Sequence, residues 1–254
     1  MRYDAIIIGG GPAGISAALT LSNMGRKSAI IATDYKDSGL YKAKRINNYP
    51  GAKAISGEEL LTLMYDQLSG ADGVTLIRGL ATNAVKNKKG FMVTVGADVY
   101  ESSVLIMAIG IGGMELLPGE AEMIGHGVSY CAVCDGGLYR GKKVAVIKLR
   151  SDCDEDIAIL KRFKCEIIEI NNLEENLIRR GDISCVFIFR KSLAINTFMP
   201  GLKLSNGINT NIDGVFAAGD CIGNPLQIAK AVGEGQLAAY RANEQLTANN
   251  NNYL

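Results

Sequence analysis

The chain has 254 residues, enough for two modest domains with separate cores, and its 48% hydrophobic and 21% charged residues are typical of a soluble globular protein. A net charge of +1 argues against nucleic acid as the main partner. No apolar run reaches membrane-spanning length, and no basic start with an apolar core and a cleavage site is present. We therefore expect a cytoplasmic protein without a membrane partner, whose six cysteines point to redox or metal chemistry.

The N-terminal segment has the pattern of a nucleotide-binding turn. An apolar strand at 5–8 enters a glycine-rich stretch, and a helix follows at 15–21. In this G-x-G-x-x-G pattern the first glycine allows a tight turn, the second lets the backbone approach a pyrophosphate, and the third permits close helix–strand packing. The alternative is an ordinary glycine-rich turn. We predict dinucleotide binding by Gly9, Gly11, Pro12, Ala13 and Gly14.

A second strand, at 27–32, is where an acidic ligand for the cofactor's ribose is expected. Asp34, slightly past its end, is the candidate, and the alternative is a solvated loop carboxylate. Further predicted elements are a helix from Ser56, a strand at 74–77, an antiparallel meander at 81–85, 91–95 and 99–101, and a buried strand at 104–108.

The pattern restarts near residue 112 with a second strand–helix–strand unit. Strands at 143–147 and 166–170 flank a helix at 152–163. The turn after the first of these strands reads Lys148-Leu149-Arg150-Ser151-Asp152 and contains no glycine that would let the backbone approach a pyrophosphate. We therefore do not expect a second nucleotide site of the usual kind.

The C-terminal third contains a short buried strand, at 214–220, that ends in Gly219 and Asp220. An Asp at such a strand end can accept hydrogen bonds from a polyol, and the alternative is a helix-capping residue. A long helix is expected at 226–246, and the composition of 247–254 predicts a disordered tail.

The stretch around Cys131 and Cys134 carries the candidate reactive chemistry. Two cysteines at this spacing can close a small disulfide, and a helix beginning there would lower a thiol pKa. Asp135 adds a candidate proton donor. The pair alone is also compatible with a zinc half-site, but zinc needs four ligands. The remaining cysteines are dispersed and expected to be buried, His126 is expected to be structural, and no metal is predicted: Cys153, Cys165, Cys185, Cys221 and His126.

Four motifs, in order and over nearly the whole chain, resemble those of the low-molecular-weight thioredoxin reductases. They are Gly9–Gly14, Asn48-Tyr49-Pro50-Gly51, the stretch 127–136 with the cysteine pair, and 214–220 followed by Gln227-Ile228-Ala229. The resemblance implies an α/β fold in which an FAD-binding, Rossmann-like (three-layer ββα) domain carries an inserted smaller α/β disulfide domain. The implied boundaries are 1–111 and 208–254 for FAD binding and 112–207 for the insert.

Two departures set the chain apart from the NADPH-dependent members. The insert is shorter than is usual, and it lacks both the glycine-rich turn and a basic His-Arg-Arg cluster after its second strand, which ends at Ile170-Asn171-Asn172. In this the chain resembles the ferredoxin-dependent flavin thioredoxin reductases, which do not use pyridine nucleotides. Open alternatives are reduction by NAD(P)H or by a second flavin, and a flavin-binding interaction protein without turnover.

The resemblance also implies roles for individual residues. Reduced ferredoxin supplies electrons to FAD, which passes them to the Cys131–Cys134 disulfide and so to thioredoxin. Cys134 faces the flavin, Cys131 attacks the thioredoxin disulfide, and Asp135 is the general acid/base. Beyond the glycine turn and Asp34, the implied FAD contacts are Ser38, Gly39, Asn48, Gly219, Asp220, Gln227, Ile228 and Ala229.

Only a few residues can be assigned to the partners that the resemblance implies. A ferredoxin is normally acidic, so its docking face should be basic. Two runs are candidates, although such runs are more often simply solvated surface: Lys42, Lys44 and Arg45, or Arg140, Lys142 and Lys143. Tyr253 could stack on an exposed flavin, with a disordered tail as the alternative. A homodimer is implied by the resemblance alone.

Overall fold

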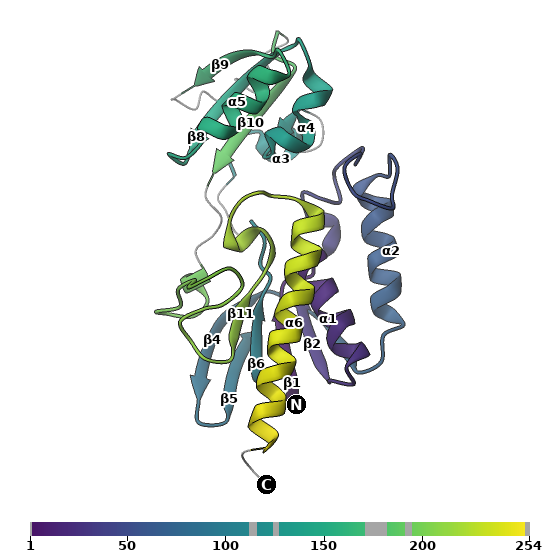
Figure 1. Cartoon of the computed structure of the whole chain (residues 1–254), viewed down its shortest axis with the longest axis vertical. Coiled ribbons are helices and arrows are strands. Elements are labelled where there is room, and N and C mark those ends of the chain that lie inside the picture. Colours follow the sequence, from purple (N-terminus) through teal and green to yellow (C-terminus); the bar gives the residue numbers. More distant parts are fainter. Residues whose placement is uncertain (1, 112–115, 124–126, 171–181, 191–194, 252–254) are drawn as a thin grey trace. The chain divides into compact units, whose positions relative to one another are not determined.

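The computed structural model describes residues 2–111, 116–123, 127–170, 182–190 and 195–251. The chain divides into two compact units, each with its own sheet and core (Figure 1). Unit 1 comprises Met1–Ser38, Glu59–Gly112 and Ser192–Leu254, and unit 2 comprises Gly39–Glu58 and Gly113–Lys191. The division into FAD-binding and inserted segments assigns functions to parts of the chain, and it stays a prediction.

Unit 1 is built on a seven-stranded sheet in the order β3-β2-β1-β6-β5-β4, with β11 also paired to β6. Its strands are β1 (Arg2–Ile8), β2 (Ser28–Ala32), β3 (Val74–Arg78), β4 (Ala81–Asn87), β5 (Gly90–Val95), β6 (Asp98–Met107) and β11 (Val215–Ala217). The β1, β2, β3 and β11 pairings are parallel, whereas β4 and β5 form the predicted antiparallel meander with β6. The sequence pattern therefore predicted this mixed α/β sheet correctly.

One long strand, β6, replaces two predicted strands. It pairs antiparallel with β5 through Asp98–Ser102 and parallel with β11 through Leu105–Met107, with β1 on its other edge. The prediction of two strands was wrong because the side chains change midway from partly exposed to fully buried while the backbone continues. At this change the buried Ser102 donates its hydroxyl to the Val104 carbonyl, 2.7 Å away.

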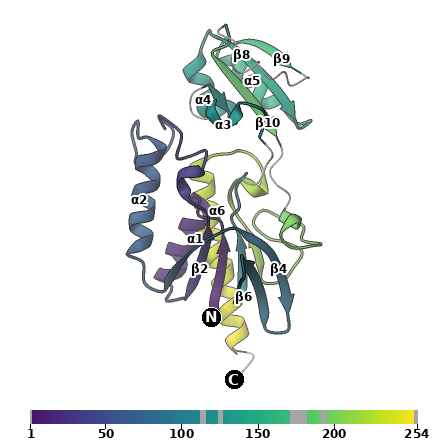
Figure 2. The same ribbon diagram turned by 180° about the vertical axis from the view of Figure 1, so that it is seen from behind.

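Three of the predicted helices are α1 (Pro12–Asn23), α2 (Gly57–Ser69) and α6 (Ile228–Asn251). Figures 1 and 2 show α1 and α6 side by side on the same face of the unit 1 sheet. The Ser16 hydroxyl donates to the Val232 carbonyl at 2.7 Å, and a Cβ at Gly235 would lie 2.0 Å from the carbonyl oxygen of Ala13. The two helices therefore approach closely because one of them carries no side chain at the crossing.

The C-terminal helix is longer than predicted. Residues 247–251 continue α6 instead of forming a disordered tail, so this part of the prediction was wrong. Arg26 donates to Asn243 at 2.7 Å and to Thr247 at 2.8 Å, and Leu246 is buried. These tertiary contacts offset the low helix propensity of the asparagine-rich end. Across the described ranges no helix, α6 included, is long and apolar enough to cross a membrane.

Unit 2 contains a four-stranded parallel sheet in the order β7-β10-β8-β9. Its strands are β7 (Val128–Ser129), β8 (Lys143–Leu149), β9 (Glu166–Ile170) and β10 (Cys185–Arg190), and its helices are α3 (Glu120–Met123), α4 (Ala132–Asp135) and α5 (Asp154–Arg162). The β8–α5–β9 unit was predicted. The sequence reading missed β10, a short buried strand at the centre of the sheet.

Candidate active site

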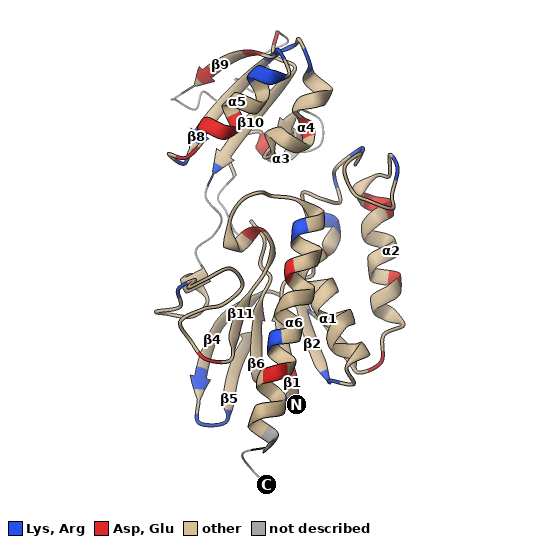
Figure 3. Ribbon diagram, in the orientation of Figure 1, with Lys and Arg blue, Asp and Glu red and all other residues tan. Residues whose placement is uncertain are grey.

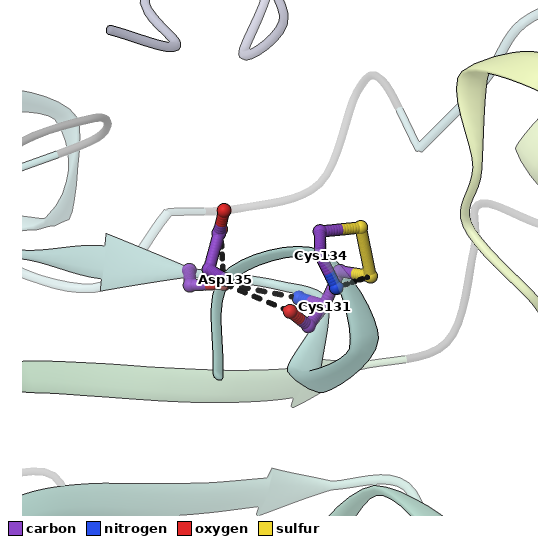
Figure 4. Close-up of a disulfide and its surroundings, with 4 residues drawn as sticks. Cys131, Cys134 and Asp135 are labelled. Atoms are coloured by element: carbon purple, nitrogen blue, oxygen red, sulfur yellow. Dashed lines mark hydrogen bonds between the residues drawn. A yellow bond between two sulfur atoms is a disulfide. The ribbon is translucent and has the colours of Figure 1, made fainter. Parts of the chain in front are cut away.

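Cys131 and Cys134 form a disulfide at the start of α4, with their Cα atoms 5.3 Å apart (Figure 4). The Cys134 backbone N–H donates to the Cys131 sulfur at 3.1 Å, so that Cys131 caps the short helix. The intervening Ala132 is fully buried against the unit 2 core, whereas Val133 is 50% exposed. A Cβ at Gly136 would lie 2.9 Å from the Phe163 ring. A small residue between the cysteines and another just after them therefore let the motif pack against the core, while both cysteines stay partly accessible.

Asp135 follows the disulfide and is largely buried. The Ser129 hydroxyl donates to Asp135 Oδ2 at 2.7 Å. Figure 4 shows Asp135 next to the two cysteines. Burial raises the pKa of the Asp135 carboxyl above its ordinary value, and the Ser129 hydrogen bond opposes part of that rise. A carboxyl beside a dithiol with a raised pKa can take up and release a proton closer to neutral pH than a free one.

The four other cysteines are buried and free, which confirms the prediction that they behave as small apolar residues: Cys153, Cys165, Cys185 and Cys221. Burial raises the pKa of each of these thiols, and the Cys185 value reaches about 12. They are therefore protonated at neutral pH and unsuited to attack a disulfide. His126 lies outside the described residues, and among those residues no group of His, Cys, Asp or Glu is arranged to hold a metal ion.

The glycine-rich turn of unit 1 lies between β1 and α1, as predicted. Gly9 has φ +116°, and a Cβ there would lie 2.1 Å from the carbonyl oxygen of Ala108, the residue after β6. A Cβ at Gly14 would lie 1.9 Å from the Gly9 carbonyl oxygen, whereas one at Gly11 would meet no atom within 4 Å. Pro12 begins α1. Two glycines are thus required by the protein's own packing, and the third leaves an open position at the helix start.

Gly219 and Asp220 follow β11 and lie against this turn. A Cβ at Gly219 would lie 2.9 Å from the Ala13 Cβ, so residues about 200 positions apart are neighbours. Glu234 on α6 accepts from the Gly219 N–H at 2.9 Å, and Lys230 donates to the Gly219 carbonyl at 3.3 Å and to Glu234 at 3.0 Å. The 3-10 turn that carries Asp220 is therefore tied to the helix beside it.

Asp220 presents an unsatisfied oxygen. Its Oδ1 is buried without a hydrogen-bond partner among the described residues. Burial raises the pKa of Asp220 to about 6, with Lys230 opposing and Glu234 adding to the rise. Because buried polar atoms are nearly always paired, an orphan acceptor at this edge of the sheet indicates a position for a hydroxyl or N–H donor of a ligand.

The remaining predicted cofactor residues have mixed surroundings. Asp34 Oδ1 accepts the Lys36 N–H at 3.0 Å and caps a 3-10 turn, and the Ser38 hydroxyl donates to the Tyr35 carbonyl at 2.7 Å. Gly39 and Asn48 belong to the segment grouped with unit 2. Gln227, Ile228 and Ala229 stand at the start of α6. Their contacts with FAD stay predictions.

Tyr65 was missed by the sequence reading. From α2 its hydroxyl donates to the Gly10 carbonyl at 2.9 Å, and its ring stacks on Tyr35 with centroids 4.4 Å apart. A Cβ at Gly10 would lie 2.3 Å from this hydroxyl. Tyr65 therefore stabilises the glycine-rich turn through a hydrogen bond from α2. No local pattern marks it, because it meets the turn only through the tertiary fold.

The glycine-free turn after β8 is filled by Arg150. Its side chain is 7% exposed, forms ion pairs with Asp156 and, at 3.0 Å, with Asp152, and lies 5.7 Å from the Phe189 ring centroid. Besides Asp156, the first turn of α5 carries two further acidic residues, Asp154 and Glu155, and that end of α5 is coloured red in Figure 3. At this end of unit 2 the Arg150 side chain thus occupies the turn, and several carboxyl groups lie at the start of α5.

Curated relatives of this chain are thioredoxin reductases. The enzyme of Ureaplasma parvum is 28% identical and that of Bacillus subtilis 26%, with 98% and 93% of this chain and 98% and 92% of those proteins covered. The alignment with the Ureaplasma protein spans 304 positions, more than the 254 residues of this chain, so the relative carries segments that this chain lacks.

Solved structures give the same result. A ferredoxin-flavin thioredoxin reductase from Clostridium acetobutylicum is 29% identical with a TM-score of 0.64, and 98% of each chain is covered. The thioredoxin reductase of Streptococcus pyogenes is 26% identical with a TM-score of 0.81, with 97% of this chain and 99% of that one covered. The model of the pyridine nucleotide-disulphide oxidoreductase family matches residues 3–148. The chain therefore belongs to this family, among the low-molecular-weight thioredoxin reductases.

Proposed function

We propose that this thioredoxin reductase-type flavin disulfide oxidoreductase passes electrons from reduced ferredoxin, through FAD and the Cys131–Cys134 disulfide, to thioredoxin. Electron transfer to thioredoxin is supported by the Cys131–Cys134 disulfide, which lies at the helix start beside Asp135. Ferredoxin as the electron donor is supported by the turn after β8, which the Arg150 side chain fills. One experiment tests the donor and the acceptor separately.

FAD is the cofactor of this family, and unit 1 fits it on two counts. Gly11 leaves open space at the start of α1, where a pyrophosphate meets unpaired N–H groups. The orphan Oδ1 of Asp220 can accept a hydroxyl of the cofactor's polyol chain. The proposed holding residues are those of the glycine turn with Gly219 and Asp220. When bound, FAD would accept electrons one at a time and would supply them as a pair to a disulfide.

The two cysteines perform the exchange with the acceptor. In the reduced enzyme the Cys131 thiolate attacks one sulfur of the thioredoxin disulfide, which breaks that S–S bond and forms a mixed disulfide. The Cys134 thiolate then attacks Cys131, which restores the enzyme disulfide and releases the thioredoxin dithiol. Two electrons and two protons leave the enzyme. Asp135 accepts a proton from an attacking thiol and returns it to a leaving thiolate.

The surroundings of Arg150 support an electron donor other than a pyridine nucleotide. A pyrophosphate at the start of α5 would need backbone N–H groups and a turn without side chains. Here the Arg150 guanidinium is held in the turn by Asp152 and Asp156, and neighbouring carboxylates would repel an anion.

Basic side chains offer a docking face for an acidic ferredoxin. Lys and Arg residues gather in the loop that precedes α2, as Figure 3 shows. Lys44 and Arg45 there are exposed. In the second candidate run two side chains already make contacts within the protein: Lys143 pairs with Asp182 at 3.2 Å, and Arg140 lies over the Phe163 ring. We therefore favour the loop before α2 as the docking face for ferredoxin. The same proposal places the reaction in the cytoplasm and in a homodimer, as in the family resemblance.

The test follows the flavin absorbance of the anaerobic holoprotein. Reduced ferredoxin should bleach it quickly and, with thioredoxin present, yield thioredoxin thiols, whereas NADPH and NADH should not. Fast bleaching by NADPH would refute ferredoxin as the donor and favour the alternative of a pyridine-nucleotide enzyme. Bleaching by ferredoxin without reduction of thioredoxin would refute thioredoxin as the acceptor. A Cys134→Ser variant should stop at a mixed disulfide with thioredoxin, and normal turnover by that variant would refute the relay.

A further inference from the structure

Ser129 lies immediately behind the redox motif and was not among the predicted site residues. It ends β7, pairs with Phe187 of β10 in the sheet register, and is 4% exposed. Its hydroxyl is therefore fixed by the strand rather than by a flexible loop. Two residues later the chain reaches Cys131, and six residues later it reaches Asp135.

Three contacts surround the Ser129 oxygen. It accepts the Cys131 backbone N–H at 3.2 Å and donates to Asp135 Oδ2 at 2.7 Å, and the Cys131 carbonyl oxygen lies 3.4 Å away. A hydroxyl has one proton and two acceptor positions, so it donates to one partner at a time. With Asp135 ionised, the shorter, charge-assisted bond to the carboxylate is the stronger one.

The same oxygen can serve the protonated carboxyl. A proton on Asp135 Oδ2 would be donated to Ser129, whose own proton would then turn to the Cys131 carbonyl. No heavy atom has to move between these two arrangements. A general acid/base must be held in both protonation states, and this hydroxyl satisfies both.

Asp135 has few other electrostatic partners. Tyr139 and Cys185 face it from the following 3-10 turn and from β10, and burial raises the pKa of both, so that they are neutral near pH 7. Among the described residues no cation contributes to the Asp135 shift, and Ser129 is the side chain that hydrogen-bonds to it. The hydroxyl is thus the principal control on the orientation of this carboxyl.

We propose that Ser129 is a positioning residue for disulfide exchange, which joins the Cys131 backbone to the Asp135 carboxyl and keeps the acid in place in both of its protonation states. The inference rests on the proposed function. In the step concerned, the Cys131 S–H proton moves to Asp135, the Cys131 sulfur bonds to a substrate sulfur, the substrate S–S bond breaks, and the proton is returned to the leaving sulfur.

The test measures single turnovers of the prereduced holoenzyme against pH. Ser129→Ala removes the bond that stabilises the ionised acid, so the Asp135 limb of the pH–rate profile should move to higher pH by about one unit. Ser129→Thr, which keeps the hydroxyl, should restore the midpoint. In an Asp135→Asn background, Ser129→Ala should cause no further shift. Ser102→Ala, which also removes a buried hydroxyl bonded to a carbonyl, is the control and should leave the profile unchanged.

Two acceptors separate this inference from the proposed function. The series is run with thioredoxin and with a small aromatic disulfide that needs no protein docking. If the native chain reduces only the small disulfide, the proposed acceptor fails, and Ser129 is judged on the small-disulfide profile alone. An unshifted midpoint in Ser129→Ala, or an equal shift in the Asp135→Asn background, would overturn the positioning role.

Discussion

We predict that Asp220 couples the stability of the FAD-free protein to its affinity for FAD. Burial raises its pKa from 3.8 to about 6 and leaves Oδ1 without a partner among the described residues. Because the folded state holds the proton more tightly than the unfolded chain, stability falls as pH rises from about 4 to about 6. A rise of about 2 units at 1.36 kcal/mol per unit amounts to about 3 kcal/mol lost above pH 6.

Asp220→Asn should recover much of this loss. The amide has nearly the same shape and cannot ionise, so the FAD-free variant should be up to about 3 kcal/mol more stable than the native apoprotein at pH 7.5. The advantage should disappear near pH 4, where the native carboxyl is protonated in both states. The same change should weaken FAD binding about 10- to 100-fold, because a hydrogen bond to a charged acceptor contributes about 1.5–3 kcal/mol.

The assay is urea unfolding of both apoproteins at pH 4 and pH 7.5, with FAD affinity from flavin fluorescence. Asp66→Asn, on the exposed face of α2, is the control and should change neither quantity. Equal stability of Asp220→Asn and native apoprotein at both pH values would refute the burial argument. Unchanged FAD affinity would show that the orphan oxygen does not receive a cofactor donor.

Four further substitutions test other parts of the structure. Gly11→Ala should leave the stability of the apoprotein within about 1 kcal/mol of native, since its Cβ meets only open space. The same variant should weaken FAD binding at least tenfold in a fluorescence titration. Gly14→Ala should weaken FAD binding and also destabilise the apoprotein, because its Cβ would lie 1.9 Å from a carbonyl oxygen. Glu120→Gln should cost about 3–5 kcal/mol in urea unfolding, because fully buried Glu120 pairs with Arg190; a loss under 1 kcal/mol would contradict this. Ser28→Ala should stabilise by about 1 kcal/mol, because Ser28 Oγ is buried without a partner among the described residues, and a loss of stability would show an unseen bond.

Local patterns predicted the elements on which the chemistry depends. Apolar periodicity, glycine spacing and residue type within short stretches of chain predict the β1–turn–α1 segment, the β8–α5–β9 unit and the helix start at the cysteine pair. The errors arose where burial changes along one element or where distant contacts stabilise a weak one. Thus β6 was divided in two, and the last turns of α6 were missed although Arg26 holds them.

The candidate site shows the same division. The residue types alone indicated a redox pair, an acidic neighbour and a dinucleotide turn, because each needs only local spacing. Sequence could not show that Ser129 meets Asp135, that Tyr65 braces Gly10, or that Arg150 fills the turn beside α5. Each of these contacts depends on the path of a strand or helix between the partners.

By itself, the sequence predicted the two chemical centres proposed for this protein: a glycine-rich turn with the pattern of a dinucleotide site and a cysteine pair at the spacing of a redox disulfide. Only the tertiary structure decided how each centre is held. It places Gly219 against Ala13 and leaves the Asp220 oxygen unpaired nearby, and it aligns β7 so that a buried hydroxyl reaches the acid. The physical reason is that spacing along the chain encodes local geometry, whereas burial and hydrogen-bond satisfaction arise when distant segments pack.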